Sequence, residues 1–294
     1  MQILVRQFVS VSSMLACLLL APAANAEQCF EENSWVSPER SEYVSETDVF
    51  NKLTDAKMIF LGEHHTNESH HLWHAELLER LLQNGNWAIG LEAFPRSSQA
   101  LLDRWIRGDI DEANLRKNTN WDAVWSFPFD YYLPVLYLAQ RYKSPLIALN
   151  VERELVRATR VDGWKNVPQN QREGVDDPEI PGKDYLQKLA ASFQRHNTQA
   201  IGPEQKQQFQ RFVEQQLLWD RAMARAVGDY RKTHPTVNIL SIVGSWHLID
   251  FHGVPFQLNS LGYSDATVLI PWDNHLNCSD LNKNFSTYIY TPSQ

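Results

Sequence analysis

The chain has 294 residues and a formal net charge of −8, and 43% of its residues are hydrophobic. A chain of this length and composition can bury a large globular core. Its acidic balance, with no run of basic residues, argues against nucleic acid as a partner.

The first 26 residues are typical of a secretory signal peptide. Arg6 is the only charged residue in them, Val9 to Leu20 is largely apolar, and Ala24-Asn25-Ala26 is a small-residue cleavage pattern. We therefore predict an exported, periplasmic protein whose mature chain begins at Glu27. Cys17 leaves a lipoprotein anchor open, but this is the less favoured alternative because Cys17 is followed by more apolar residues. No later apolar run is long enough to span a bilayer.

Two cysteines remain in the predicted mature chain. Cys29 and Cys278 lie near its two ends. In an exported protein such a pair predicts a disulfide that ties the termini together. Two distant free thiols are the alternative.

The stretch from residue 58 to residue 82 combines a predicted strand, a turn and a helix. Met58 to Leu61 is a short apolar run that ends at Gly62, which is typical of a buried strand and its exit turn. Thr66 and Asn67 are good helix N-caps. Apolar residues then recur at helical spacing, at positions 75, 78, 81 and 82. The turn therefore presents Glu63, His64 and His65.

Half of the ten histidines fall in this stretch, and several belong to the predicted helix. His71, His74 and Leu78 are three and four positions apart, so they share the helix face that packs inward. Two histidines there, close to Glu63 and His65, could form a metal or cofactor site. The alternative is structural, with polar residues at a helix start and a hydrogen-bonded core histidine.

Further strands are predicted at Trp87 to Glu92, Pro145 to Asn150, Val237 to Val243 and Ala266 to Ile270. Helices are predicted between them, including Tyr132 to Tyr142, Asp184 to about Arg195 and Pro203 to about Lys232. Alternating strands and helices indicate parallel pairing. We predict a three-layer α/β/α fold with a mostly parallel central sheet and an additional helical segment. It forms a single domain over residues 27–294, with a helical insertion at about 165–232.

Three of the predicted strands end in ionisable residues. Glu63 and His65 follow the first strand, Glu92 ends the second, and His247 follows Gly244 after the fourth. In a parallel sheet these ends meet at one edge, where ligands bind. The four side chains are a credible ligand set for Zn, Mn or Fe. They are equally a credible acid–base set without metal, with Glu63 or Glu92 as the general base.

Several motifs resemble the ChaN-like haem-binding family. They are Leu61-Gly62-Glu63-His64-His65 with His70-His71, Gly90-Leu91-Glu92, the segment from Gln216 to Ala224, Tyr185-Leu186-x-x-Leu189 with Phe193 and His196, and Gly244-Ser245-Trp246-His247 with Gly253-Val254-Pro255. The paired Gly-x-x-His motifs are also similar to those of the wider superfamily, which includes Tiki metalloproteases and erythromycin esterases.

The resemblance implies an exported protein of iron or haem acquisition that binds haem, often as a homodimer, with a possible membrane-associated uptake partner. It implies that a tyrosine ligates haem iron and that a histidine comes from the partner subunit. Tyr185 and His196 are the candidates, because a two-fold pair of antiparallel helices would bring them together. The alternative is that Tyr185 packs on the core and His196 is solvated. The alternative function is a metal-dependent peptide or ester hydrolase.

Overall fold

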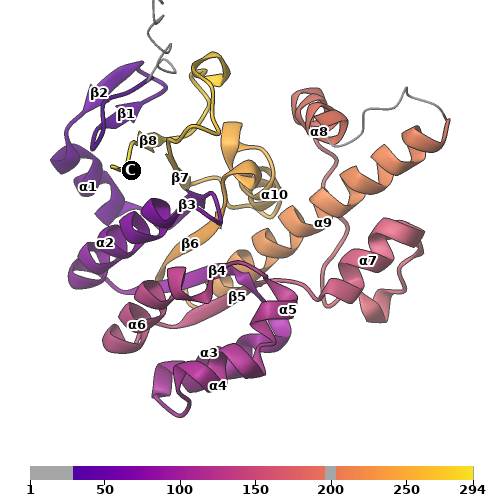
Figure 1. Ribbon diagram of the computed structural model, residues 1–294, viewed down its shortest axis with the longest axis horizontal. Coiled ribbons are helices and arrows are strands. Elements are labelled where there is room, and N and C mark those ends of the chain that lie inside the picture. Colours follow the sequence, from indigo (N-terminus) through magenta and orange to yellow (C-terminus); the bar gives the residue numbers. More distant parts are fainter. Residues whose placement is uncertain (1–28, 196–202, 294) are drawn as a thin grey trace, which may run out of the picture.

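A central eight-stranded sheet organises the computed structural model, which describes residues 29–195 and 203–293 (Figure 1). The strand order is β2-β1-β8-β7-β3-β6-β4-β5. The strands are β1 (Trp35–Ser37), β2 (Glu42–Val44), β3 (Met58–Glu63), β4 (Trp87–Pro95), β5 (Leu146–Asn150), β6 (Asn238–Gly244), β7 (Ala266–Pro271) and β8 (Tyr288–Tyr290). All pairings from β8 through β5 are parallel, whereas β1 pairs antiparallel with both β2 and β8. The prediction of a mostly parallel sheet is therefore confirmed.

The five predicted strands are all present as β3 to β7. The three short strands β1, β2 and β8 were missed. Both β1 and β2 lie within residues 30–50, before the first helix begins. These strands exist because the two ends of the chain meet, with Trp35 paired to Tyr290.

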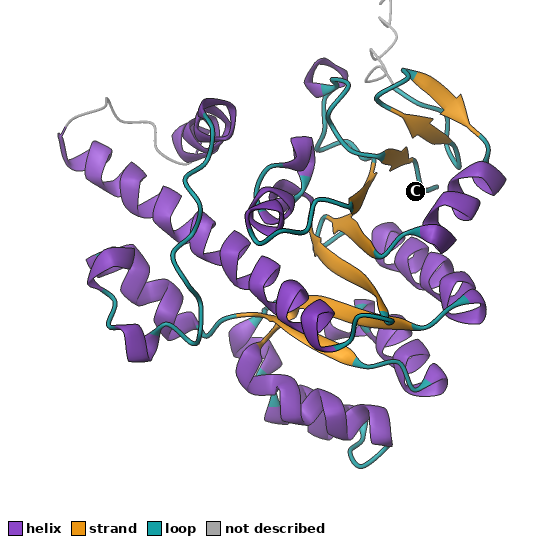
Figure 2. Ribbon diagram, turned by 180° about the vertical axis from the view of Figure 1, so that it is seen from behind, coloured by secondary structure: helices purple, strands orange, loops and turns teal. Residues whose placement is uncertain are grey.

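Helices cover both faces of the sheet (Figure 2). They are α1 (Glu46–Asp55), α2 (Glu68–Asn84), α3 (Gln99–Arg107), α4 (Glu112–Asn118), α5 (Trp121–Val124), α6 (Leu133–Tyr142), α7 (Arg153–Asp162), α8 (Lys183–Arg195), α9 (Pro203–Thr233) and α10 (Val254–Ser260). Alternate side chains of β3 point to opposite faces of the sheet and pack against the two helical layers. Ile59 and Leu61 pack with the buried residues of α1, α2, α3 and α6. Met58 and Phe60 pack with those of α9 and α10. This arrangement is the predicted three-layer α/β/α fold.

The additional helical segment is built around α9, which has 31 residues. Its C-terminal half packs on the sheet through Met223, Ala224 and Val227. Its N-terminal half extends past the sheet, with α7 and α8 beside it (Figure 1). Leu218 and Ala222 join Leu155 of α7 in a third, smaller hydrophobic cluster. The proposed insertion boundaries at about 165 and 232 stay a prediction.

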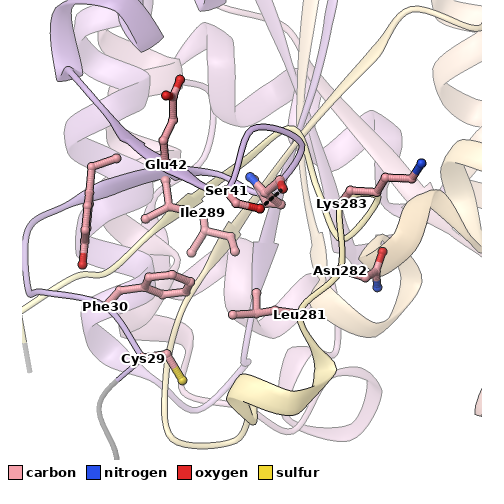
Figure 3. Close-up of a pocket in the computed structure, with 11 residues that line it drawn as sticks. Cys29, Phe30, Ser41, Glu42, Leu281, Asn282, Lys283 and Ile289 are labelled. Carbon is pink, nitrogen blue, oxygen red and sulfur yellow. Dashed lines mark hydrogen bonds between the residues drawn. The ribbon is translucent and has the colours of Figure 1, made fainter.

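Cys29 and Cys278 form a disulfide, as predicted, with their Cα atoms 5.6 Å apart. It ties the first described residues to the segment before β8. Figure 3 shows the adjoining cavity of about 270 Å³, which is lined by β1, β2 and the C-terminal segment, including Phe30 and Leu281. None of the ionisable residues predicted to form the site lines this cavity.

Candidate functional site

The four side chains predicted to converge lie together at the carboxyl ends of β3, β4 and β6. His65 Nδ1 is 2.6 Å from Glu63 Oε1. The Glu92 carboxylate accepts a hydrogen bond from the Gly244 N–H at 2.6 Å. Its other oxygen lies 3.8 Å from His247 Nε2. The side chains of His65 and His247 are 25% and 12% exposed, so this edge is partly accessible to solvent.

The backbone at Gly244, which begins the motif Gly244-Ser245-Trp246-His247, lies against the His65 ring. A Cβ added to Gly244 would lie 3.1 Å from the Cε1 and Nε2 atoms of His65. This is closer than side chains normally approach, so a larger residue would require the His65 ring to shift by a few tenths of an ångström. Gly253 plays a similar part for His247, because its φ is +61° and an added Cβ would lie 2.4 Å from the His247 carbonyl oxygen.

Glu63 is the buried centre of the first half of the site. It is 3% exposed, and its Oε1 accepts hydrogen bonds from Tyr132 Oη and from His65, both at 2.6 Å. Burial alone would raise the pKa of Glu63, but the His65 hydrogen bond and the nearby His71, His65 and His74 lower it to about 2. Glu63 is therefore ionised at neutral pH.

His65 is held between the carboxylates and an aromatic wall. Its ring centroid is 4.8 Å from those of Trp125 and Phe127. Burial lowers the pKa of His65, but the hydrogen bond to Glu63 and the charge of Glu92 outweigh it and raise the pKa overall. Trp125 and Phe127 thus form a wall of the site.

His247 belongs to a second buried chain of hydrogen bonds. Its Nδ1 lies 2.6 Å from Asp220 Oδ1, and Asp220 Oδ2 accepts a hydrogen bond from Tyr185 Oη at 2.8 Å. Burial lowers the pKa of His247, but Asp220 and then Glu92 raise it to about 9. His247 is therefore an imidazolium at neutral pH.

The raised pKa of His247 gives a direct prediction. We expect its ring to titrate near pH 9. Asp220→Asn should bring the pKa down to the ordinary value of about 6.5 or below, because burial then acts without the Asp220 charge. NMR of ring-labelled histidine measures both values, and the exposed His234 provides a signal that the substitution should not move. An unchanged His247 titration in Asp220→Asn would contradict this account.

Sequence reasoning missed the roles of Asp220 and Tyr132. Asp220 is a polar residue in an otherwise largely apolar stripe of α9, and it is 0% exposed. A polar residue at such a position is a candidate partner for a buried histidine. Tyr132 had no such signal, because it lies in a stretch dense in aromatics. Its hydroxyl also accepts a hydrogen bond from Trp125 Nε1 at 2.9 Å.

Of the two predicted haem-binding residues, the structure describes Tyr185 but not His196. Tyr185 is 5% exposed, and its hydroxyl is engaged by Asp220. Burial, with the charge of Asp220, raises the pKa of Tyr185 well above its usual value. His196 lies outside the described residues. The assignment of Tyr185 and His196 as haem-binding residues stays a prediction.

Residues able to share one metal ion differ from the four-residue set predicted at the strand ends, and one group includes the two helix histidines, His71 and His74. Within residues 29–195 and 203–293, two groups have ligand atoms all within 4.8 Å of one another. One is Glu63, His71 and His74, and the other is His64, Asp273 and His275. The predicted set of Glu63, His65, Glu92 and His247 shares only Glu63 with these groups and stays a prediction.

The ionisable side chains at this edge of the sheet form a possible acid–base site, referred to below as the acid–base edge. Two carboxylate–imidazole pairs, Glu63–His65 and Asp220–His247, face Glu92 from two sides. Such pairs hold protons at defined atoms and orient the imidazole rings. The near-complete burial of the carboxylates fixes these positions.

Comparison with known proteins identifies the family. The chain matches the family model for haem-binding uptake proteins of the Tiki superfamily, ChaN, over residues 49–258. Among solved structures it is similar to ChaN of Campylobacter jejuni, with a TM-score of 0.70 and 20% identity over 88% of this chain and 97% of that chain. An erythromycin esterase, EreC, has a TM-score of 0.47 and 14% identity over 81% and 76% of the two chains. No curated protein sequence matched.

The family match spans most of the chain, from α1 into α10, and so includes both histidine motifs, Glu92 and Asp220. The likeness to the Campylobacter jejuni structure shows that the fold is shared. The chain belongs to the ChaN haem-binding uptake family of the Tiki superfamily.

Proposed function

We propose that this protein is an exported haem-binding protein of iron or haem acquisition. The observation that carries the proposal is the family match over residues 49–258. The solved ChaN of Campylobacter jejuni, which shares the fold, is described as binding haem cofacially. The hydrolase alternative is not favoured, because the hydrolase-like structures are distant.

A cavity of about 570 Å³ lies in the helical segment, between α7, α8 and α9. Its volume is within the range of about 300–1,000 Å³ that is typical of cofactor sites. Phe193, Phe212 and Trp219 are its aromatic lining residues, and most of the others are polar, including Arg160 and Arg211. The aromatic rings suit the face of a porphyrin and the two arginines suit its propionates. Tyr185 does not line this cavity.

We propose Tyr185 as the iron ligand and His196 of a second chain as its partner across a two-fold axis. Tyrosinate is a known ligand of haem iron. Tyr185 would have to exchange its hydrogen bond to Asp220 for a bond to iron. Ligation would also overcome the raised pKa of Tyr185, because iron binds the deprotonated oxygen. The homodimer is part of this proposal.

Haem titration of variants tests the ligand assignment. We expect Tyr185→Phe and His196→Ala each to weaken haem binding about tenfold or more, or about 1.4 kcal/mol. Tyr185→Phe should also remove the absorption bands that arise from tyrosinate ligation. The measurement is the Soret absorption during titration, together with the mass in solution.

Matched controls separate ligation from a general loss of structure. Tyr137→Phe removes an exposed hydroxyl on α6 that bonds Glu112, and His234→Ala removes an exposed ring at the end of α9. Both controls should bind haem like the parent. If Tyr185→Phe and His196→Ala bind haem like the parent, and the protein is monomeric when haem is present, then Tyr185 and His196 do not form the haem site.

Export is proposed from the sequence of the first 26 residues, which lie outside the described residues. Within residues 29–195 and 203–293, no helix combines the length and apolarity needed to cross a membrane. The intact mass of the protein recovered from cells tests the proposal, which expects a mature N-terminus at Glu27. A membrane-associated uptake partner is a further proposal that follows from the role in acquisition.

A further inference from the structure

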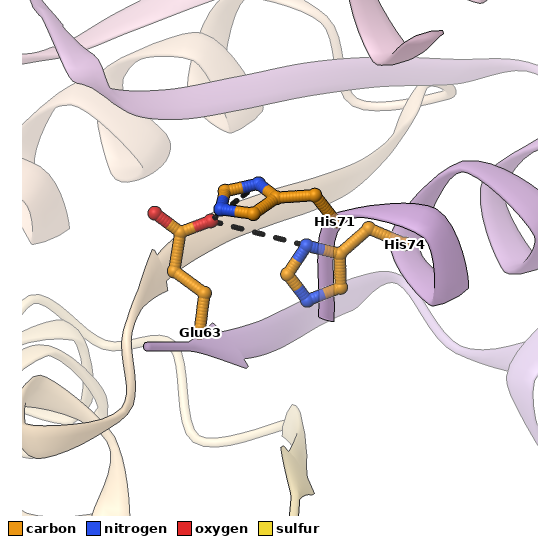
Figure 4. A group of neighbouring side chains, drawn as sticks. All are labelled: Glu63, His71 and His74. Atoms are coloured by element: carbon orange, nitrogen blue, oxygen red, sulfur yellow. Dashed lines mark ion pairs between the residues drawn. The ribbon is translucent and has the colours of Figure 1, made fainter. Parts of the chain in front are cut away.

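Glu63, His71 and His74 form a buried cluster beside the acid–base edge. Glu63 ends β3, and the two histidines lie on the inward face of α2 (Figure 4). The residues are 3%, 3% and 0% exposed. His71 Nδ1 is 3.5 Å and His74 Nδ1 is 3.9 Å from Glu63 Oε2. The three ligand atoms therefore surround one small space.

The other ring nitrogens fix where the protons are. His74 Nε2 is 2.9 Å from the Gly62 carbonyl oxygen, and His71 Nε2 is 3.2 Å from the His65 carbonyl oxygen. A carbonyl oxygen only accepts, so both Nε2 atoms must be the donors. In each neutral ring Nδ1 then carries a lone pair, and the two Nδ1 atoms lie 3.5 and 3.9 Å from Glu63 Oε2.

Glu63 Oε2 accepts no hydrogen bond from the described residues. Its partner oxygen, Oε1, accepts from both Tyr132 and His65, whereas Oε2 and His74 Nδ1 are buried without a hydrogen-bond partner. Buried acceptors left unpaired are costly, and acceptors this close to one another repel. A single proton on one ring would satisfy Oε2 and that ring but leave the other Nδ1 unpaired. A cation would satisfy all three atoms.

We propose that Glu63 Oε2, His71 Nδ1 and His74 Nδ1 form a binding site for a divalent transition-metal ion. Two imidazole nitrogens and one carboxylate oxygen are a ligand set used for zinc and for non-haem ferrous iron. Ligand atoms at about 2.1 Å from a tetrahedral ion lie about 3.4 Å from one another, close to the spacings already present. Only a small contraction around the ion is needed.

The surroundings of the three residues match those of metal ligands. Each ligating histidine donates its second ring N–H to a backbone carbonyl, which fixes ring orientation and raises ligand basicity. Tyr132 and His65 hold the carboxylate by its other oxygen. The site shares no residue with the cavity between α7, α8 and α9, so it is independent of the proposed haem site.

Cobalt binding to the full-length, haem-free protein tests the site. After treatment with chelator, the parent protein should bind one Co²⁺ per chain and show the visible absorption of an ion in a low-symmetry nitrogen–oxygen site. The variant His71→Gln/His74→Gln should lose that absorption and bind about 100-fold more weakly or worse. The matched control is His70→Gln, which replaces an equally buried histidine that is not in the cluster, and it should bind Co²⁺ with unchanged affinity.

The double variant is checked for folding by circular dichroism and, should it unfold, the single variant Glu63→Gln takes its place. That variant keeps the shape of the side chain and removes its charge, and it should also lose the Co²⁺ absorption. A parent protein that binds no Co²⁺ would overturn the proposal. Unchanged Co²⁺ binding by His71→Gln/His74→Gln or by Glu63→Gln would overturn it equally.

Discussion

Asp220→Ala should destabilise the fold by about 3–5 kcal/mol, because it removes one partner of a buried ion pair and leaves the other without compensation. Asp220 is 0% exposed and accepts from both His247 and Tyr185. Its loss therefore leaves two buried donors unpaired. Chemical denaturation of the variant and the parent measures the difference in the free energy of unfolding.

The control for this substitution is Asp229→Ala, on the same helix. Asp229 pairs with Arg225 at 2.8 Å, and its side chain is 54% exposed. An exposed pair of this kind contributes about 0–1 kcal/mol, so Asp229→Ala should be nearly neutral. Equal losses in the two variants would mean that the Asp220 network does not hold the fold together.

The effect of Asp220→Ala should also depend on pH. The folded-state pKa of His247 is raised to about 9, above its unfolded value of about 6.5. The stabilisation that comes from charged His247 is therefore complete below pH 6.5 and is lost as the pH rises through 9. The difference in the free energy of unfolding between the parent and Asp220→Ala should narrow between these two pH values. A gap that widens with pH would contradict the assignment of His247 as an imidazolium.

Loss of the Cys29–Cys278 disulfide is the second change with a large expected effect. The bond closes a loop with a sequence separation of 249. In the chain-entropy model such a cross-link stabilises by about 5.5 kcal/mol through the unfolded state. Cys29→Ser/Cys278→Ser should lower the free energy of unfolding by that order, as measured by denaturant titration.

Reduction of the parent protein is the matched control, because it removes the same cross-link without a substitution. The reduced parent and the double variant should therefore unfold at the same denaturant concentration. If the parent unfolds identically with and without reductant, the bond contributes no stability. Two alkylatable thiols in the unreduced protein would show that the bond does not form.

The central sheet and its functional edge could be predicted from the sequence because both depend on local patterns. Short apolar runs followed by glycine mark β3 and β6, and the carboxyl ends of parallel strands meet by geometry. This places Glu63, His65, Glu92 and His247 together without knowledge of any contact. Helical spacing likewise places His71 and His74 on one inward face of α2.

Other features depend on contacts between distant parts of the chain. β1 and β8 have three residues each, and their pairing joins the two ends of the chain. No periodicity shows in so short a strand. The hydrogen bond from Tyr132 to Glu63 spans 69 positions, and that from Tyr185 to Asp220 spans 35. The sequence offers candidates for such partners but not the pairing.

Haem titration of the full-length parent protein tests the account most directly. The absorption spectrum and the mass in solution are recorded together as haem is added. The account predicts a saturable shift of the Soret band, haem that co-elutes with the protein, and a mass that corresponds to two chains. A spectrum that remains that of free haem at every ratio, with no haem eluting with the protein, would contradict it.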